Sequence, residues 1–191
     1  MKKFFGTLLT LLVVFAATAS SPAAYSAKNH EFKISGTSNL HDWTADVPSL
    51  STSAELIVSD GKLEAINRMV VDIDATRITG SEGNIMTRKI AETLKSNKNP
   101  RIVFRMTRVD NISQTGNDFT VRAAGSLAMG GVSRPLDVVV RGRILPNGDV
   151  QFTGVKEMKM TTWQLDPPRA MMGALRTGDD VKVDFSVTLK N

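Results

Sequence analysis

The C-terminal segment Val181–Leu189 alternates apolar and polar residues without interruption. Successive side chains of a β-strand point to opposite faces, so this pattern predicts one buried face and one face in water. The same alternation runs through residues 118–129 and 134–145. The side chains predicted to be buried are Phe119, Val121, Leu136, Val138, Val183 and Phe185, and those predicted to be exposed are Arg122, Asp137, Lys182 and Asp184.

Apolar periodicity and turn residues divide most of the chain into strands. The pairs Asp60-Gly61 and Asn147-Gly148 tolerate the positive φ of tight hairpin turns, and Gly116-Asn117 gives a similar signal. Consecutive strands are therefore expected to pair mostly as hairpins in an antiparallel, meandering sheet. The expected strands are residues 31–37, 40–47, 53–59, 62–75, 101–110, 118–129, 134–145, 149–161 and 180–190.

Two segments depart from the alternation. Residues 83–97 carry an apolar residue at every fourth position from Met86 to Leu94, between charged residues, which predicts an amphipathic helix. Ser81 is expected to cap its start. Residues 163–178 contain Pro167-Pro168, and adjacent prolines exclude a regular ladder. We expect this second segment to form a long ordered loop or a plug against the sheet.

The long apolar face of these strands needs a surface to pack against. A sheet closed into a barrel buries that face and removes the exposed edges, and a two-layer sandwich buries it as well. Segments 62–75 and 134–145 exceed the usual strand of about six residues, as strongly tilted barrel strands do. The sequence therefore favours an all-β fold, an antiparallel barrel of about eight strands with one short amphipathic helix.

The first residues have the pattern of a secretory signal peptide. Met1-Lys2-Lys3 is cationic, Phe4–Phe15 is apolar, and small residues follow at the positions that determine cleavage. The apolar run is shorter than the roughly 20 residues of a membrane-spanning helix, so no stable membrane span is expected. The sequence predicts a signal peptide over residues 1–19, with cleavage as late as residue 27, and one exported, periplasmic or secreted domain over residues 20–191.

The composition of the chain restricts the range of possible cofactors and binding partners. The chain has no Cys, which excludes disulfides, Cys-ligated metals and a lipid-modified N-terminal Cys. Its formal net charge is +5, and loss of Lys2 and Lys3 with the leader would leave +3. A charge this small, with acidic and basic residues well mixed, argues against a nucleic-acid partner.

Side chains capable of chemistry are sparse. His30 and His41 are the two histidines, and His41-Asp42 is the one pair that suggests acid–base catalysis. We expect His41 to be a partly buried hydrogen-bonding residue rather than a base. Neither a set of metal ligands nor a serine-nucleophile motif occurs. The sequence thus predicts no enzyme, no metal and no cofactor.

Methionines fall on or close to the inward face of several strands. Methionine fills gaps in a solid core, and its flexible thioether also lets a cavity wall adapt to an apolar chain. The interior of an eight-stranded barrel suits either arrangement, so the residues alone leave a packed and a hollow barrel open. These methionines are Met106, Met129, Met158 and Met160.

Lys156 is the exception to the inward apolar pattern. Continuing the alternation from Phe152 turns Lys156 inward, so either a bulge near Val155 resets the register or a cation lies at the rim of a cavity. We favour the bulge. Glycines within strands mark bends or close approaches, and here we expect barrel corners. These glycines are Gly125, Gly142 and Gly154.

Several motifs, in order along the chain, resemble the YceI-like family, whose members are periplasmic, lipocalin-like barrels that bind polyisoprenoids and related lipids. The most specific are Pro100-Arg101-Ile102-Val103-Phe104 and the hairpin Ala124–Leu136. The others are Ser38-Asn39-Leu40-His41-Asp42-Trp43, Met69–Ala75, the helix with Arg88 and Leu94, and Thr177–Phe185.

The resemblance implies a long-chain isoprenoid or fatty lipid inside the barrel, and it leaves the oligomeric state open. A secreted hydrolase that uses His41 and Asp42 on a lipid or ester is the first alternative. A packed structural barrel without a ligand is the second. The residues expected to line an apolar cavity are Trp43, Met69, Val71, Ile73, Ile102, Phe104, Met106, Phe119, Val121, Leu127, Met129, Leu136, Val138, Val140, Phe152, Met158, Met160, Val183, Phe185 and Val187.

Overall fold

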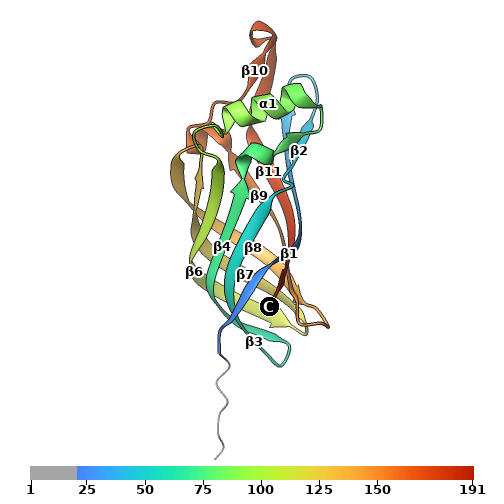
Figure 1. Cartoon of the computed structure of the whole chain (residues 1–191), viewed down its shortest axis with the longest axis vertical. Helices are drawn as coiled ribbons and strands as arrows, with labels where there is room; N and C mark the ends of the chain where they lie inside the picture. The colour runs from blue at the N-terminus through green and yellow to red at the C-terminus, as the bar shows by residue number, and fades with distance from the viewer. Residues whose placement is uncertain (1–20) are drawn as a thin grey trace, which may run out of the picture.

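The alternating segments form the wall of a closed antiparallel barrel in the computed structural model, which describes residues 21–191 (Figure 1). Eight strands make up this wall. The predicted all-β barrel is therefore confirmed, and the sandwich is excluded. The wall strands are β1 (Ala23–Ser38), β3 (Leu50–Ser59), β4 (Lys62–Asp74), β6 (Arg101–Thr115), β7 (Asp118–Met129), β8 (Val132–Ile144), β9 (Val150–Lys159) and β11 (Leu175–Lys190).

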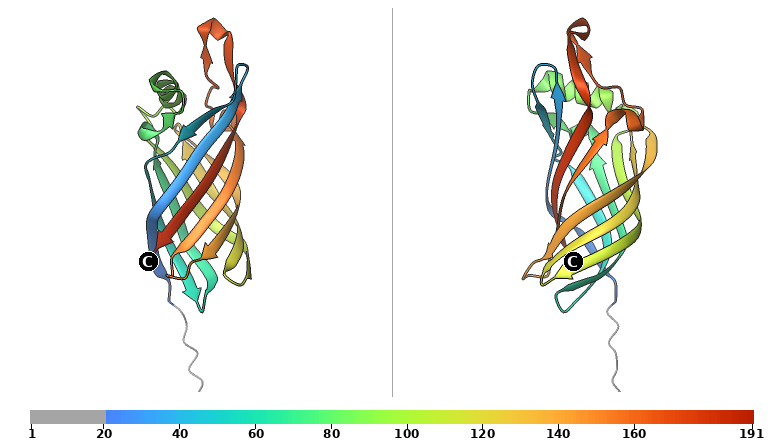
Figure 2. Two further views of the ribbon diagram at one scale, coloured as in Figure 1. Left: turned by 90° about the vertical axis from the view of Figure 1, so that its right-hand side faces the viewer. Right: turned by 180° about the vertical axis from the view of Figure 1, so that it is seen from behind.

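Closure comes from the pairing of the first and last wall strands. β1 and β11 pair from Ser26↔Lys190 to Ser38↔Thr177, with two local irregularities. The start of β1 also pairs with β3, from Ala23↔Leu56 onward, so one long strand contacts both neighbours. Figure 2 shows β1 and β11 side by side and tilted across the barrel, as a closed sheet of few strands requires.

The remaining elements gather at one end of the barrel, opposite the C-terminus (Figure 1). Within residues 21–191, no helix is long and apolar enough to cross a membrane. The elements are β2 (Trp43–Asp46), η1 (Ala75–Arg77), β5 (Thr79–Gly80), α1 (Asn84–Thr93), η2 (Met160–Trp163), β10 (Arg169–Ala170) and η3 (Met171–Gly173).

The predicted cap of the helix is wrong. The residue before α1 is Gly83, whose φ of 83° turns the chain into the helix, and no side chain caps this end. Ser81 is held elsewhere, because its backbone N–H donates to the carbonyl of Thr44. The helix also ends at Thr93, earlier than expected, and the chain reverses at Lys95 with a φ of 52°.

The end of the barrel that carries the C-terminus is solidly packed. Its side chains come from the ends of the wall strands, and Phe119 and Phe152 meet there edge to face with ring centroids 5.4 Å apart. Tyr25 joins this core from the start of β1, which the sequence pattern missed because it placed that strand later. Beside it, the hydrogen bond from Lys28 Nζ to Asp149, 2.7 Å long, lowers the pKa of the Asp149 carboxyl.

The strand glycines lie beneath aromatic rings rather than at barrel corners. Gly142 is the register partner of Phe119, and Gly154 is that of Phe185; in both pairs the ring occupies the space of a missing Cβ. Phe104 covers Gly125 in the same way. The expectation of corners is thus wrong, and close approach is the reason for these glycines.

We expect Gly142→Ala to destabilise the barrel. A Cβ there would overlap the Phe119 ring and lie 2.6 Å from the carbonyl oxygen of Gln151, which belongs to the backbone and cannot turn away. The free energy of unfolding should fall by about 1–3 kcal/mol in urea denaturation, the usual effect of overpacking. Arg141→Ala, on the exposed face next to it, should change it by less than about 0.5 kcal/mol. Equal midpoints for Gly142→Ala and the parent protein would contradict this account.

Candidate functional site: an apolar cavity in the barrel

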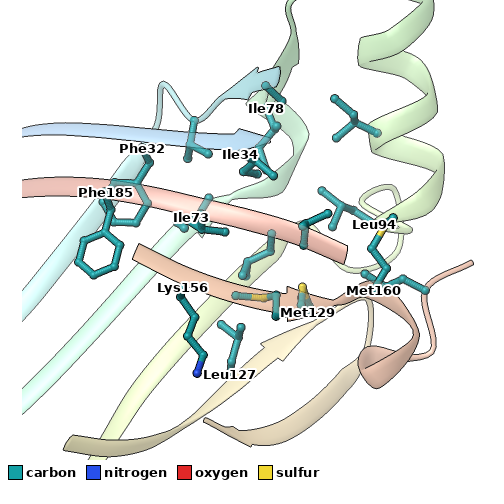
Figure 3. Close-up of a pocket in the computed structure, with 18 of the residues that line it drawn as sticks. Phe32, Ile34, Ile73, Ile78, Leu94, Leu127, Met129, Lys156, Met160 and Phe185 are labelled. Carbon is teal, nitrogen blue, oxygen red and sulfur yellow. The ribbon is translucent and has the colours of Figure 1, made fainter. Parts of the chain in front are cut away.

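Above the packed end the barrel is hollow. A cavity of ≈ 580 Å³ runs from the packed core toward α1, within the usual range for sites that bind small molecules. Its wall consists of inward side chains from β1, β4, β6, β7, β8, β9 and β11. Nearly all of these are aliphatic, aromatic or methionine side chains, and Figure 3 shows how they converge from opposite walls.

The structure places the predicted lining residues around this cavity with one exception. Phe119 lies in the packed end, where its ring is 3% exposed and covers Gly142. The strand register is the predicted one, but Leu136, Val138, Val183 and Phe185 are only half-buried because they face the cavity. Asp184, predicted to be exposed, is half-buried on the outer face. As contacts of a ligand, all of these residues stay predictions.

Several lining residues escaped the sequence reasoning. Phe32 and Ile34 occupy alternate positions of a predicted strand, so the apolar–polar alternation could have placed both on its inward face. Phe32 stacks on Phe185 with ring centroids 5.3 Å apart. The apolar side of α1 also faces the cavity, through Met86 and Ile90 among others. No local pattern indicates that a helix at the barrel end closes over the interior, because this depends on the tertiary fold.

The mouth of the cavity lies at the α1 end. Leu40, in the turn between β1 and β2, and Ile85, in α1, both line the cavity and are 70% and 71% exposed. The helix lies across this end of the barrel (Figure 1). Polar side chains among the lining residues belong mostly to this mouth, including Glu82 and Lys89. An apolar molecule would thus pass a partly polar rim before it reached the dry interior.

One side of the mouth is held by η2. Trp163 is 2% exposed, and its indole N–H donates to the carbonyl of Leu127 at 2.8 Å, which ties η2 to β7. The Thr161 hydroxyl and backbone N–H both donate to Asp179, and the hydroxyl bond is the main cause of the lowered pKa of this carboxyl. The start of the predicted loop or plug, residues 163–178, is therefore anchored at the edge of the cavity. Further along this segment, Arg169–Ala170 pairs with residues 175–176 as a short hairpin rather than as a loop.

His41 lies at the mouth and is more exposed than expected. Its side chain is 49% exposed, with Nδ1 2.8 Å from the carbonyl oxygen of Asp42 and 3.3 Å from Glu82 Oε1. The hydroxyl of nearby Ser38 donates to the His41 carbonyl and accepts from backbone N–H groups, so it is engaged by the turn rather than by the imidazole. This arrangement orders the turn between β1 and β2. Among residues 21–191, no group of three or more potential metal ligands occurs.

The predicted bulge near Val155 is absent, and Lys156 points inward. The β9–β11 ladder is continuous from Asp180↔Lys159 to Leu189↔Val150, which preserves the alternation. Val155 accordingly faces out and is 55% exposed, whereas Lys156 lines the cavity (Figure 3). The unbroken pairing with β11 keeps the alternation of β9, even though this places a half-buried cationic side chain among apolar ones.

Comparison with known proteins identifies the family. A family model described as the YceI-like domain matches residues 14–189, nearly the whole chain. The chain belongs to the YceI-like family. No curated protein matches it in sequence.

Solved structures share this YceI-like fold at low sequence identity. BcnA of Burkholderia cenocepacia superposes with a TM-score of 0.62 at 16% identity, covering 85% of this chain and 96% of BcnA. A polyisoprenoid binding domain from Saccharophagus degradans, implicated in plant cell wall breakdown, gives 0.66 at 14% identity, covering 87% and 97%. The YceI protein of Campylobacter jejuni gives 0.56 at 16% identity, covering 75% and 82%.

Enlarging one leucine in each half of the barrel tests which half is hollow. Leu56→Phe, at a fully buried position in the packed end, should lower the free energy of unfolding by about 1–3 kcal/mol. Leu136→Phe makes the same change on the cavity wall and should lower it by less than about 1 kcal/mol, because the ring can enter free space. Urea denaturation of both variants measures the difference. Equal losses at the two positions would mean that the upper half is packed too.

Proposed function

We propose that the protein is an exported carrier that binds a long-chain apolar lipid, of isoprenoid or fatty type, inside the barrel. The observation that carries this proposal is the ≈ 580 Å³ cavity, walled by apolar side chains and open at the α1 end. Burial of apolar surface contributes about 25 cal/mol per Å², so a long hydrocarbon chain can bind well there with few polar contacts. Cavity-lining methionines, such as Met106 and Met158, would let the wall adapt to a flexible chain.

The family supports this ligand class. A structural neighbour is described as a polyisoprenoid binding domain, and its barrel superposes on most of this chain. A linear isoprenoid and a fatty chain place the same demand on the wall, a dry and continuous apolar surface. We therefore propose the shared chemistry, a long hydrocarbon chain, as the ligand.

The two alternatives have less support. A hydrolase built on His41 and Asp42 would need a free nucleophile, but the neighbouring Ser38 hydroxyl is engaged with backbone groups. In addition, His41 Nδ1 contacts the Asp42 carbonyl rather than its carboxylate. A packed barrel without a ligand is at odds with the ≈ 580 Å³ cavity that lies above Phe152. Binding without turnover is therefore the function that the geometry favours.

A pair of neighbouring valines tests the carrier function. Val138 lines the cavity, and Val139, the next residue of β8, faces out and is 51% exposed. We expect Val138→Asp to weaken binding of a fluorescent long-chain lipid at least tenfold, because the carboxylate brings charge and water into the apolar site. Val139→Asp should leave the affinity unchanged. Fluorescence titration and the thermal midpoint are measured for both variants and the parent protein.

The thermal midpoint separates a hollow barrel from a packed one. In a cavity that reaches solvent, the carboxylate of Val138→Asp stays partly hydrated, so the fold should survive. In a filled core the same change would cost several kcal/mol of stability. Collapse of Val138→Asp, together with no lipid binding by the parent protein, would refute the carrier and support the packed barrel.

Export by removal of a leader is the second part of the proposal. The predicted signal peptide, residues 1–19, lies outside the described residues. The structure bears on the site of cleavage, because β1 begins at Ala23 and Tyr25 is 7% exposed in the packed end. Cleavage as late as residue 27 would remove this core side chain, so we favour an early cut.

We therefore expect the mature protein to begin between Ser20 and Ala23. Intact mass analysis or N-terminal sequencing of the periplasmic or secreted protein measures this directly. A product that retains Met1 would contradict export with cleavage, and one that begins beyond Tyr25 would contradict the role of that residue in the core.

A further inference from the structure

Lys156 carries a positive charge at mid-height on the cavity wall. It lies four residues, about 13 Å of extended chain, beyond Phe152 in the packed core, and four residues before Met160 at the η2 end. Its register partner on β11 is Val183, which also lines the cavity. Figure 3 shows its amino group extending from β9 into the space between the walls. Lys156 is thus an interior residue rather than part of the rim.

The charge of Lys156 has no ionic partner among the described residues. Within residues 21–191, neither an ion pair nor a hydrogen bond joins Lys156 Nζ to another group. Glu82, the acidic residue among the cavity-lining side chains, lies at the mouth beside His41. The neighbouring residues on β9, Val155 and Glu157, are exposed on the outer face.

Lys156 borders both the cavity and an unpaired stretch of the barrel wall. The preceding inward position on β9 is Gly154, and the Phe185 ring fills the place of its missing side chain. The ladder between β8 and β9 also ends at Arg141↔Thr153, so the edge of β9 beside Lys156 is not paired with β8. A ligand inside the barrel can therefore reach the Lys156 side chain through the cavity that this side chain lines.

From this geometry we infer that Lys156 binds the anionic headgroup of the lipid, and that this headgroup is a carboxylate. The inference rests on the proposed lipid-binding function. An ammonium among apolar side chains is costly unless it is paired, and a ligand carboxylate supplies the missing charge and acceptors. In this orientation the headgroup lies midway along the cavity, and the hydrocarbon chain extends from it along the apolar wall.

The number of charges favours a carboxylate over a phosphate. Lys156 supplies one positive charge, which matches the single negative charge of a carboxylate. A phosphate monoester carries close to two negative charges and is typically bound by several cations or by bidentate arginines. Lys89 and Arg169, the other cationic lining residues, belong to the mouth elements α1 and β10 rather than to the wall around Lys156.

Three lipids that differ only in their headgroup test this inference. Hexadecanoic acid, hexadecanol and hexadecyl phosphate share one chain, so the apolar contribution to binding cancels. Each competes with a fluorescent long-chain lipid for the parent protein, for Lys156→Met and for Lys156→Arg. Lys182→Met, which removes an exposed lysine from the outer face of β11, is the matched control. Methionine approximates the length of lysine, and circular dichroism verifies that each variant is folded.

For the parent protein we expect the acid to bind about 10- to 100-fold more tightly than the alcohol, the range for a hydrogen bond to a charged group. Lys156→Met should abolish this preference without weakening the alcohol, whereas Lys156→Arg and Lys182→Met should retain it. Equal affinities for acid and alcohol in the parent protein, or a preference that survives Lys156→Met, would overturn the inference. A Lys156-dependent preference for the phosphate over the acid would overturn the carboxylate assignment. A bound probe that none of the three lipids displaces would overturn the headgroup inference and leave lipid binding in place. If neither the fluorescent lipid nor any of the three competitors binds the parent protein, the proposed lipid-binding function itself fails.

Discussion

The pairing of β1 with β11 is the constraint on which the rest of the structure depends. It joins the two ends of the described chain and leaves the wall strands without long free edges at the seam. Closure also explains the alternation of apolar and polar residues, because one face of every wall strand then points to a common interior and the other faces outward. The register of β1 against β11 shifts near Ala27 and again near Gly36, and the pairing continues past both irregularities.

The interior of the barrel consists of a packed end and an end that holds the cavity. At the C-terminal end, aromatic rings such as Phe119 fill the space directly above strand glycines such as Gly142, so the strands and rings pack without a gap. Toward α1, aliphatic, aromatic and methionine side chains surround the cavity, and buried residues such as Trp163 form a second packed cluster beside it. These packed clusters stabilise a domain that also contains a cavity.

Local sequence patterns predicted much of the fold and of the cavity wall, and each wrong prediction has a specific physical cause. Period-two alternation predicted the strands and the inward face, because parity in a strand requires no knowledge of its partners. The strand glycines were misassigned because covering rings such as Phe185 lie on another strand. Lys156 was misassigned because an apolar face was assumed to exclude charge, whereas the ladder of β9 with β11 holds the lysine inward. The position of α1 over the mouth is a tertiary property and had no local signal.

The central proposal is that the apolar cavity in the upper half of the barrel binds a lipid chain. Native mass spectrometry of the protein purified from its own lipid-replete host tests this claim most directly. The account predicts a folded species heavier than the mature chain by the mass of a long-chain lipid, which organic extraction removes and mass analysis identifies. Protein that carries no lipid from such a host, and takes up none when lipid is added, would contradict it.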